Sequence, residues 1–198
     1  MRSQLSIALA FSCFLVRAQT PELKPGLYAF FETDKGAFTA ELFEKYTPKS
    51  VSVFIGLAQG ARAWYDPQTK AMVKRPLYDG VTFHRVINGE MIQAGDPGGT
   101  GTHNCGTKLR DEFLPGLRFD RAGKLAIANT GEPDSGGCQF FITVGAVNRW
   151  DNKYTIFGQI VSGQKVVDEI GKGALSGDKP LHPVTIQSVK IRRVVKTQ

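Results

Sequence analysis

The spacing of short apolar segments and turns restricts the fold of this chain more than any other feature of its sequence. Segments that alternate apolar and polar side chains follow one another directly, and the chain contains 22 glycines. Such alternation is typical of half-buried strands, and no regular strand–helix alternation accompanies it. We therefore predict an all-β dominated fold, a closed eight-stranded antiparallel β-barrel capped by two α-helices. The predicted strands cover residues 27–31, 37–43, 81–87, 91–94, 124–129, 139–144, 154–160 and 184–194, and the helices begin at Pro48 and Gln164.

The first 18 residues have the pattern of a secretory signal peptide. Arg2 precedes an apolar run over residues 5–16, which is too short to cross a bilayer, and Ala18 ends a small-residue cleavage site. We expect an exported protein, periplasmic or secreted, with a short lead over 19–26 and one domain over 27–195. Cys13 leaves a lipid anchor open as an alternative, although the residues before it match a lipobox poorly.

The formal net charge of +7 raises the question of an anionic partner. Lysines and arginines are scattered, except in the segments 70–75 and 190–196, and the second segment alternates with apolar residues as a strand with one wet face does. We assign the charge to solubility. The prediction is a monomer that binds no nucleic acid and has no membrane span.

Cysteine and histidine positions bear on disulfides and metals. Cys105 and Cys138 remain after removal of the leader, and an oxidising compartment permits a disulfide between them without establishing one. The three histidines, His84, His103 and His182, lie in unrelated contexts, so no metal and no cofactor are predicted.

Two other segments are predicted to be loops. The stretch 62–75 is polar and contains Asp66-Pro67, which is typical of a surface loop. The glycine-rich stretch 98–106 is followed by Thr107-Lys108, the reverse of the order that a phosphate-binding loop requires, and no helical pattern follows it.

Residues 83–97 contain the most informative polar side chains. Asn88-Gly89 predicts a tight turn, so the flanking segments form a hairpin, with Arg85 and Gln93 near its opposite ends. Arg85, Gln93 and Met91 are expected to line one concave surface. Arg85 has apolar neighbours and no acidic residue within four positions, which suggests that it polarises a bound ligand. The alternative is a surface arginine with its head in water.

A second pair of segments, 126–129 and 139–143, also combines amides with aromatic rings. On a strand Gln139 and Phe141 share one face, and Phe140 points to the other. A plain sandwich core disfavours such glutamines, because an unpaired buried amide is costly.

Together these segments closely resemble the cyclophilins, the cyclosporin-binding peptidyl-prolyl isomerases. The resemblance covers about residues 27–195, and the insertion over 64–78 is similar to one in a subset of bacterial members. The matching motifs are Phe83-His84-Arg85-Val86-Ile87, Met91-Ile92-Gln93, Gly95-Asp96-Pro97, Ala128-Asn129, Gly137, Gln139-Phe140-Phe141-Ile142, Phe157-Gly158 and Val161-Ser162-Gly163.

The resemblance implies an enzyme that accelerates rotation about X–Pro bonds in exported polypeptides and so assists their folding, with no cofactor and no covalent intermediate. Arg85 would stabilise the twisted prolyl amide, and Gln93 would position Arg85 or the substrate carbonyl. His84 is not expected to be a catalyst, and Asp96 is expected to shape a turn. Phe83, Met91 and Phe141 would form the proline pocket, and Trp150 takes about the place of another apolar pocket residue. Ala128 and Asn129 would hold the peptide backbone beside Gln139, and Tyr154 stands at the pocket rim, where a histidine is common.

The chain departs from the family pattern at several positions. Glu90 stands where members usually carry an aromatic residue, and its carboxylate is close enough in sequence to pair with Arg85. The tryptophan of the drug-binding loop aligns with Arg149 or Trp150, which leaves cyclosporin binding open. A binding module that grips proline-containing segments without turnover is the competing hypothesis, and a structural or nucleic-acid-binding barrel is a third.

Overall fold

The computed structural model describes residues 23–196. The predicted signal peptide, its cleavage site and Cys13 lie outside the described residues. Within 23–196 no helix combines the length and the apolar character needed to cross a bilayer.

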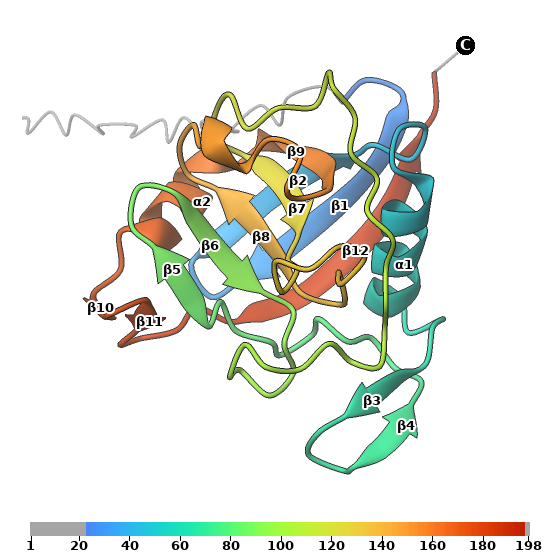
Figure 1. Ribbon diagram of the computed structural model, residues 1–198, viewed down its shortest axis with the longest axis vertical. Helices are drawn as coiled ribbons and strands as arrows, with labels where there is room; N and C mark the ends of the chain where they lie inside the picture. Colours follow the sequence, from blue (N-terminus) through green and yellow to red (C-terminus); the bar gives the residue numbers. More distant parts are fainter. Residues whose placement is uncertain (1–22, 197–198) are drawn as a thin grey trace, which may run out of the picture.

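An eight-stranded antiparallel sheet forms the body of the protein, in the strand order β12-β1-β2-β9-β7-β8-β6-β5 (Figure 1). Helix α1 (Pro48–Ala58) packs against β12, and α2 (Gln164–Gly171) packs against β2 and β6. The predicted β-dominated class, strand number and helices are confirmed. The strands are β1 (Gly26–Thr33), β2 (Gly36–Leu42), β5 (Arg85–Ile87), β6 (Met91–Ala94), β7 (Lys124–Ile127), β8 (Phe140–Thr143), β9 (Ile156–Ser162) and β12 (Ile186–Val194).

The predicted closure of the barrel is wrong, because the sheet is an open half-barrel with β12 and β5 at its ends. Residues 81–84 were expected to extend β5, but Phe83 and His84 are both buried, which breaks the alternation of a strand. This segment meets the start of β12 through an isolated bridge between Thr82 and Thr185. The amide of Phe83 donates to the carbonyl of Val184 over 2.9 Å.

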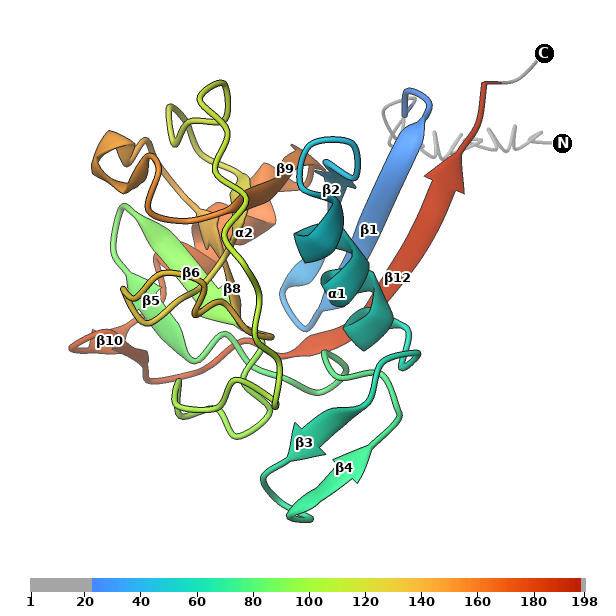
Figure 2. The same ribbon diagram turned by 45° about the vertical axis from the view of Figure 1, so that its right-hand side comes forward.

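The predicted surface loop over 62–75 is instead a hairpin of β3 (Trp64–Asp66) and β4 (Ala71–Val73), which projects from the body in both views (Figures 1 and 2). Trp64 is buried and its indole Nε1 donates to the carbonyl of Arg75 over 2.9 Å. The Arg75 guanidinium lies 4.9 Å from the indole centroid and binds Asp66 over 2.9 Å. These contacts order the insertion, and Trp64 joins it to the main core.

Adjacent residues of β8 point into two different apolar clusters, as predicted from the alternation. Phe140 belongs to the main core between the sheet and α1, with its ring centroid 5.7 Å from that of Phe54. Phe141 belongs to a second cluster on the other face, which also contains Met91, Phe119 and Ile156. The second cluster forms the base of the candidate site.

Candidate active site

A cavity of about 590 Å³ lies over the second cluster, between the β5–β6 hairpin and the loops that follow β7 and β8. Its walls combine apolar, amide and charged side chains, which is typical of a ligand site. The lining residues include Arg85, Ile87, Glu90, Met91, Gln93, Thr100, Gly101, Ala128, Asn129, Thr130, Phe141, Arg149, Trp150 and Tyr154.

The β5–β6 hairpin places Arg85 and Gln93 directly opposite each other in the antiparallel register. The prediction that they lie near opposite ends of the hairpin is wrong, because the turn at Asn88-Gly89 falls midway between them. Gly89 has a φ of +74°, which suits glycine at a tight turn. Arg85 Nη1 donates to Gln93 Oε1 over 3.4 Å.

Two amides continue the network away from Arg85. Gln93 Nε2 donates to Gln139 Oε1 over 2.8 Å. Gln139 Nε2 donates in turn to the carbonyls of Gly101 and His103, over 3.0 and 2.8 Å. Both glutamines therefore have partners, which removes the cost of burying an unpaired amide. Gln139, predicted to contact the substrate, does not line the main cavity but a smaller cavity of about 140 Å³, which shares Gln93 and Asn129 with it.

The other partner of Arg85 is Asp178, which the sequence did not predict. Asp178 Oδ2 accepts hydrogen bonds from Arg85 Nε over 3.2 Å and from Nη2 over 3.0 Å. The two residues are 93 positions apart. No local pattern indicates the contact, because it depends on how a distant hairpin packs against β5.

The floor of the cavity is aromatic. Phe141 is buried and lies edge-on to Trp150 and Tyr154, with centroid distances of 5.3 and 5.2 Å. Phe119, which the sequence did not single out, stacks on Phe141 with a centroid distance of 5.8 Å. Met91 is buried in the same cluster. This surface can hold a small apolar ring.

Phe83 does not contribute to this floor. It is fully buried in the main core, so its predicted place in the proline pocket is corrected. The reason is the irregular backbone before β5, which turns Phe83 to the face opposite the cavity. Asn129 does line the cavity, where its Nδ2 donates to the carbonyl of Lys153 over 2.9 Å.

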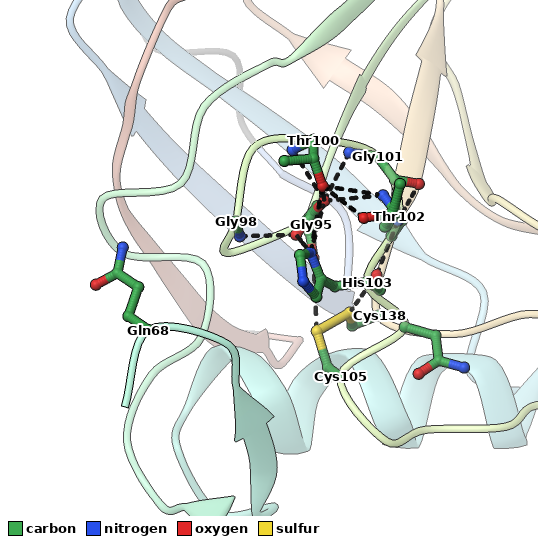
Figure 3. A network of polar contacts seen from close by, with 12 residues as sticks. Gln68, Gly95, Gly98, Thr100, Gly101, Thr102, His103, Cys105 and Cys138 are labelled. Carbon is green, nitrogen blue, oxygen red and sulfur yellow. Dashed lines mark hydrogen bonds and ion pairs between the residues drawn. A yellow bond between two sulfur atoms is a disulfide. The ribbon is translucent and has the colours of Figure 1, made fainter. Parts of the chain in front are cut away.

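Asp96 organises the loop on one side of the site, and Figure 3 shows Gly98, Thr100, Gly101 and Thr102 of this loop gathered in one network of polar contacts. Its buried carboxylate accepts hydrogen bonds from the amides of Gly98, Thr100, Gly101 and Thr102, at 2.6 to 3.2 Å. Burial raises the pKa of Asp96, but these hydrogen bonds outweigh it and hold the pKa below its ordinary value. Asp96 therefore shapes a turn and is saturated with donors, which leaves it unsuited to act as a base.

His84 is also outside the cavity. Burial lowers the pKa of its imidazole and favours the neutral ring. Neither ring nitrogen has a hydrogen-bond partner among the described residues. Among the same residues no group of three or more His, Cys, Asp or Glu side chains is placed to hold a metal ion. The absence of a metal stays a prediction.

Comparison with known proteins identifies the family. The family model for cyclophilin type peptidyl-prolyl cis-trans isomerase/CLD matches residues 28–191. The chain belongs to the cyclophilin family.

Similar proteins agree with this assignment to the cyclophilin-type peptidyl-prolyl cis-trans isomerases. Peptidyl-prolyl cis-trans isomerase A of Mycobacterium tuberculosis is 45% identical over 166 residues, covering 82% of this chain and 91% of the relative. Peptidyl-prolyl cis-trans isomerase B of Streptomyces anulatus is 44% identical over 169 residues, covering 83% and 96%. A crystal structure of a Cryptosporidium parvum cyclophilin superposes with a TM-score of 0.73 at 28% identity, covering 85% of this chain and 98% of the other.

Glu90, the main departure from the cyclophilin pattern, binds Arg149 and not Arg85. The pairing of Glu90 with Arg85, which the sequence left open, is therefore not formed. Arg149 also lies over the Trp150 ring, with its guanidinium carbon 5.3 Å from the centroid. The carboxylate is neutralised at the rim, so the aromatic floor and Arg85 remain available to a ligand.

A disulfide joins Cys105 to Cys138 (Figure 3). Cys138 immediately precedes Gln139, and Cys105 lies two residues after His103. Because Gln139 donates to the carbonyl of His103, the disulfide and this hydrogen bond connect the same two segments. The sequence left this pairing open.

Proposed function

We propose that this isomerase acts on X–Pro bonds of exported polypeptides, and that Arg85 supplies the catalytic hydrogen bond. The observation that carries the proposal is the placement of the Arg85 guanidinium and the Phe141 ring on one cavity. The apolar floor would hold the pyrrolidine ring, and the guanidinium would lie at its edge. Ala128 and Asn129, which also line the cavity, would hold the peptide backbone.

The chemistry needs no nucleophile and no cofactor. Rotation about the X–Pro bond meets a barrier of about 20 kcal/mol, because the nitrogen lone pair is delocalised into the carbonyl. In the twisted transition state the nitrogen becomes pyramidal and accepts a hydrogen bond. A donor aimed at that nitrogen stabilises the twisted state more than the planar one, which is the requirement for catalysis. Arginine remains charged at any working pH.

The substrate class is supported by a relative. A crystal structure of the Cryptosporidium parvum cyclophilin was obtained in the presence of the dipeptide Ala-Pro, and it superposes on this chain with a TM-score of 0.72 at 28% identity. Proline-containing polypeptides are accordingly the proposed substrates of this chain.

Export is a separate part of the proposal. It is supported by the signal-peptide pattern of residues 1–18 and by the disulfide, since such bonds persist mainly in oxidising compartments. N-terminal sequencing of the full chain recovered from a periplasmic or culture fraction tests it. Gln19 is the expected first residue, and a protein that retains residues 1–18 in the cytoplasm contradicts it.

A protease-coupled assay on a short prolyl peptide tests the catalytic part. Replacing Arg85 with Ala is expected to lower kcat/KM by at least about 100-fold, the usual effect of removing one preorganised donor. Gln93→Ala, which leaves the guanidinium in place, is expected to cost less. An unchanged kcat/KM in Arg85→Ala overturns the assignment.

A further inference from the structure

The turn between β10 (Leu175–Ser176) and β11 (Lys179–Pro180) carries Asp178 to the candidate active site. Gly177 has a φ of +61°, which allows this two-residue turn. The small hairpin lies beside β5 in both views (Figures 1 and 2), and the amide of Val86 donates to the Asp178 carbonyl over 2.8 Å. The backbone of Asp178 is therefore fixed to the strand that carries Arg85.

The Arg85 guanidinium is held from two sides. Asp178 Oδ2 accepts from Nε and Nη2 at 3.2 and 3.0 Å, and Gln93 Oε1 accepts from Nη1 at 3.4 Å. A guanidinium has five N–H groups in one plane. Three of them are used by these contacts, which leaves one N–H on each terminal nitrogen without a partner in the described part of the chain.

The carboxylate has two opposing effects on Arg85. It offsets part of the positive charge, and it restricts a long side chain that otherwise samples many rotamers. The side chains of Arg85 and Asp178 are 45% and 54% exposed, so solvent screens the charge effect, and such a pair adds little to folding stability. Solvent does not screen the restriction of the Arg85 side chain, because that restriction comes from the directionality of the hydrogen bonds to Asp178.

We propose that Asp178 is a positioning residue for the isomerase reaction. It orients the guanidinium plane of Arg85, so that the unpartnered N–H groups are directed at the prolyl amide. The inference rests on the proposed role of Arg85. In this arrangement Gln93 holds one edge of the guanidinium and Asp178 the other, so that loss of either widens the range of orientations.

A double-mutant cycle tests the proposal on the whole chain. Kinetics of a prolyl peptide are measured for the wild type, Asp178→Asn, Arg85→Ala and the double variant. Asn keeps the size of the side chain and the backbone carbonyl that accepts from Val86. We expect Asp178→Asn to lower kcat about 3- to 10-fold with KM within about twofold, the scale of one ordinary hydrogen bond exchanged against water. In the Arg85→Ala background the same change is expected to have no effect.

Glu44→Gln is the matched control. Glu44 accepts from Arg193 at 2.6 and 2.7 Å in another arginine–carboxylate pair, outside the cavity, and its loss is expected to leave kcat unchanged. A side-chain ¹H–¹⁵N spectrum gives a second measure, in which the Arg85 Nε–H signal is expected to broaden or shift in Asp178→Asn.

Three results overturn the inference. The first is wild-type kcat in Asp178→Asn alongside a large loss in Arg85→Ala, which leaves the proposed function intact. The second is an equal loss from Asp178→Asn with and without Arg85, which shows a merely structural role. The third is full activity in Arg85→Ala, which also removes the proposed function.

Discussion

Glu90 and Arg149 form an ion pair on the wall of the active-site cavity, where an aromatic side chain is usual in the family. The Glu90 side chain is 26% exposed and that of Arg149 is 60% exposed, so both groups retain water as well as each other. The pair explains how the cavity tolerates a carboxylate beside an aromatic floor. With Glu90 in place of an aromatic residue, the cavity wall offers a substrate less apolar contact area.

Replacing Glu90 with Phe is expected to raise kcat/KM for a prolyl peptide about two- to fivefold, the gain from burying a few tens of Å² more apolar surface. The protease-coupled assay measures the change. Glu90→Gln removes the charge without adding apolar area and is expected to stay within twofold of the wild type. A fall in kcat/KM on Glu90→Phe contradicts this account of the cavity wall.

For single residues, the sequence predicted which side chains face the cavity where strand alternation determines their direction. Met91, Gln93 and Phe141 all line the cavity, as their positions on β6 and β8 indicate. The partners of charged groups were not predictable, because Asp178 and Arg149 reach the site from loops far away in the chain. Phe83 was misplaced because the alternation ends before β5.

At the scale of elements, the loop that follows β6 is built around one carboxylate. The Asp96 carboxylate accepts hydrogen bonds from four amides within the next six residues, and so holds the segment whose Gly101 and His103 carbonyls accept from Gln139. The charge of the Asp96 carboxylate therefore helps to hold the loop that positions Gln139. The sequence predicted a turn here but not its role in holding Gln139.

Acid is expected to weaken this loop. The pKa of Asp96 in the folded protein lies below its ordinary value of 3.8, so ionised Asp96 stabilises the fold above that pH. This contribution is lost as the pH falls below 3.8 toward the folded-state pKa. Urea unfolding at pH 6 and pH 3 measures it. Asp96→Asn is expected to be less stable at pH 6 and to lose less free energy of unfolding between the two pH values. An equal loss in both proteins contradicts the assignment.

The hairpins show where element prediction from sequence failed. The hairpin of β3 and β4 was predicted as a loop, because its polar residues hide the one contact that orders it, the burial of Trp64 beneath Arg75. The β10–β11 hairpin has two residues per strand, too few for any periodic pattern. The long strands β1, β2 and β12 carry clear alternation and were predicted close to their observed positions.

For the whole molecule, the active-site loops connect strands of an open half-barrel, and contacts between distant segments hold these loops in place. The disulfide between Cys105 and Cys138 is one of these contacts, linking the loop after β6 to the start of β8 across 33 positions of sequence. The sequence could not show whether the barrel closes, because closure requires pairing between β12 and β5, the two edge strands of the sheet.

Removing the disulfide by the double change Cys105→Ser and Cys138→Ser is expected to lower the free energy of unfolding by about 3 to 4 kcal/mol, from the chain entropy of a loop of this length. Guanidinium unfolding measures it. A reducing agent is expected to destabilise the wild type in the same way and to leave the double variant unchanged. Equal stability of the oxidised wild type and the double variant contradicts a structural role for the bond.

The central claim is that Arg85 catalyses prolyl rotation in a cavity that also binds the peptide. NMR exchange spectroscopy on a prolyl peptide tests it most directly, because chemical-shift changes report binding while exchange cross-peaks report cis/trans turnover. We predict accelerated exchange with the wild type, and binding of similar affinity without acceleration with Arg85→Ala. Shift changes without accelerated exchange in the wild type, or equal acceleration by Arg85→Ala, would contradict it.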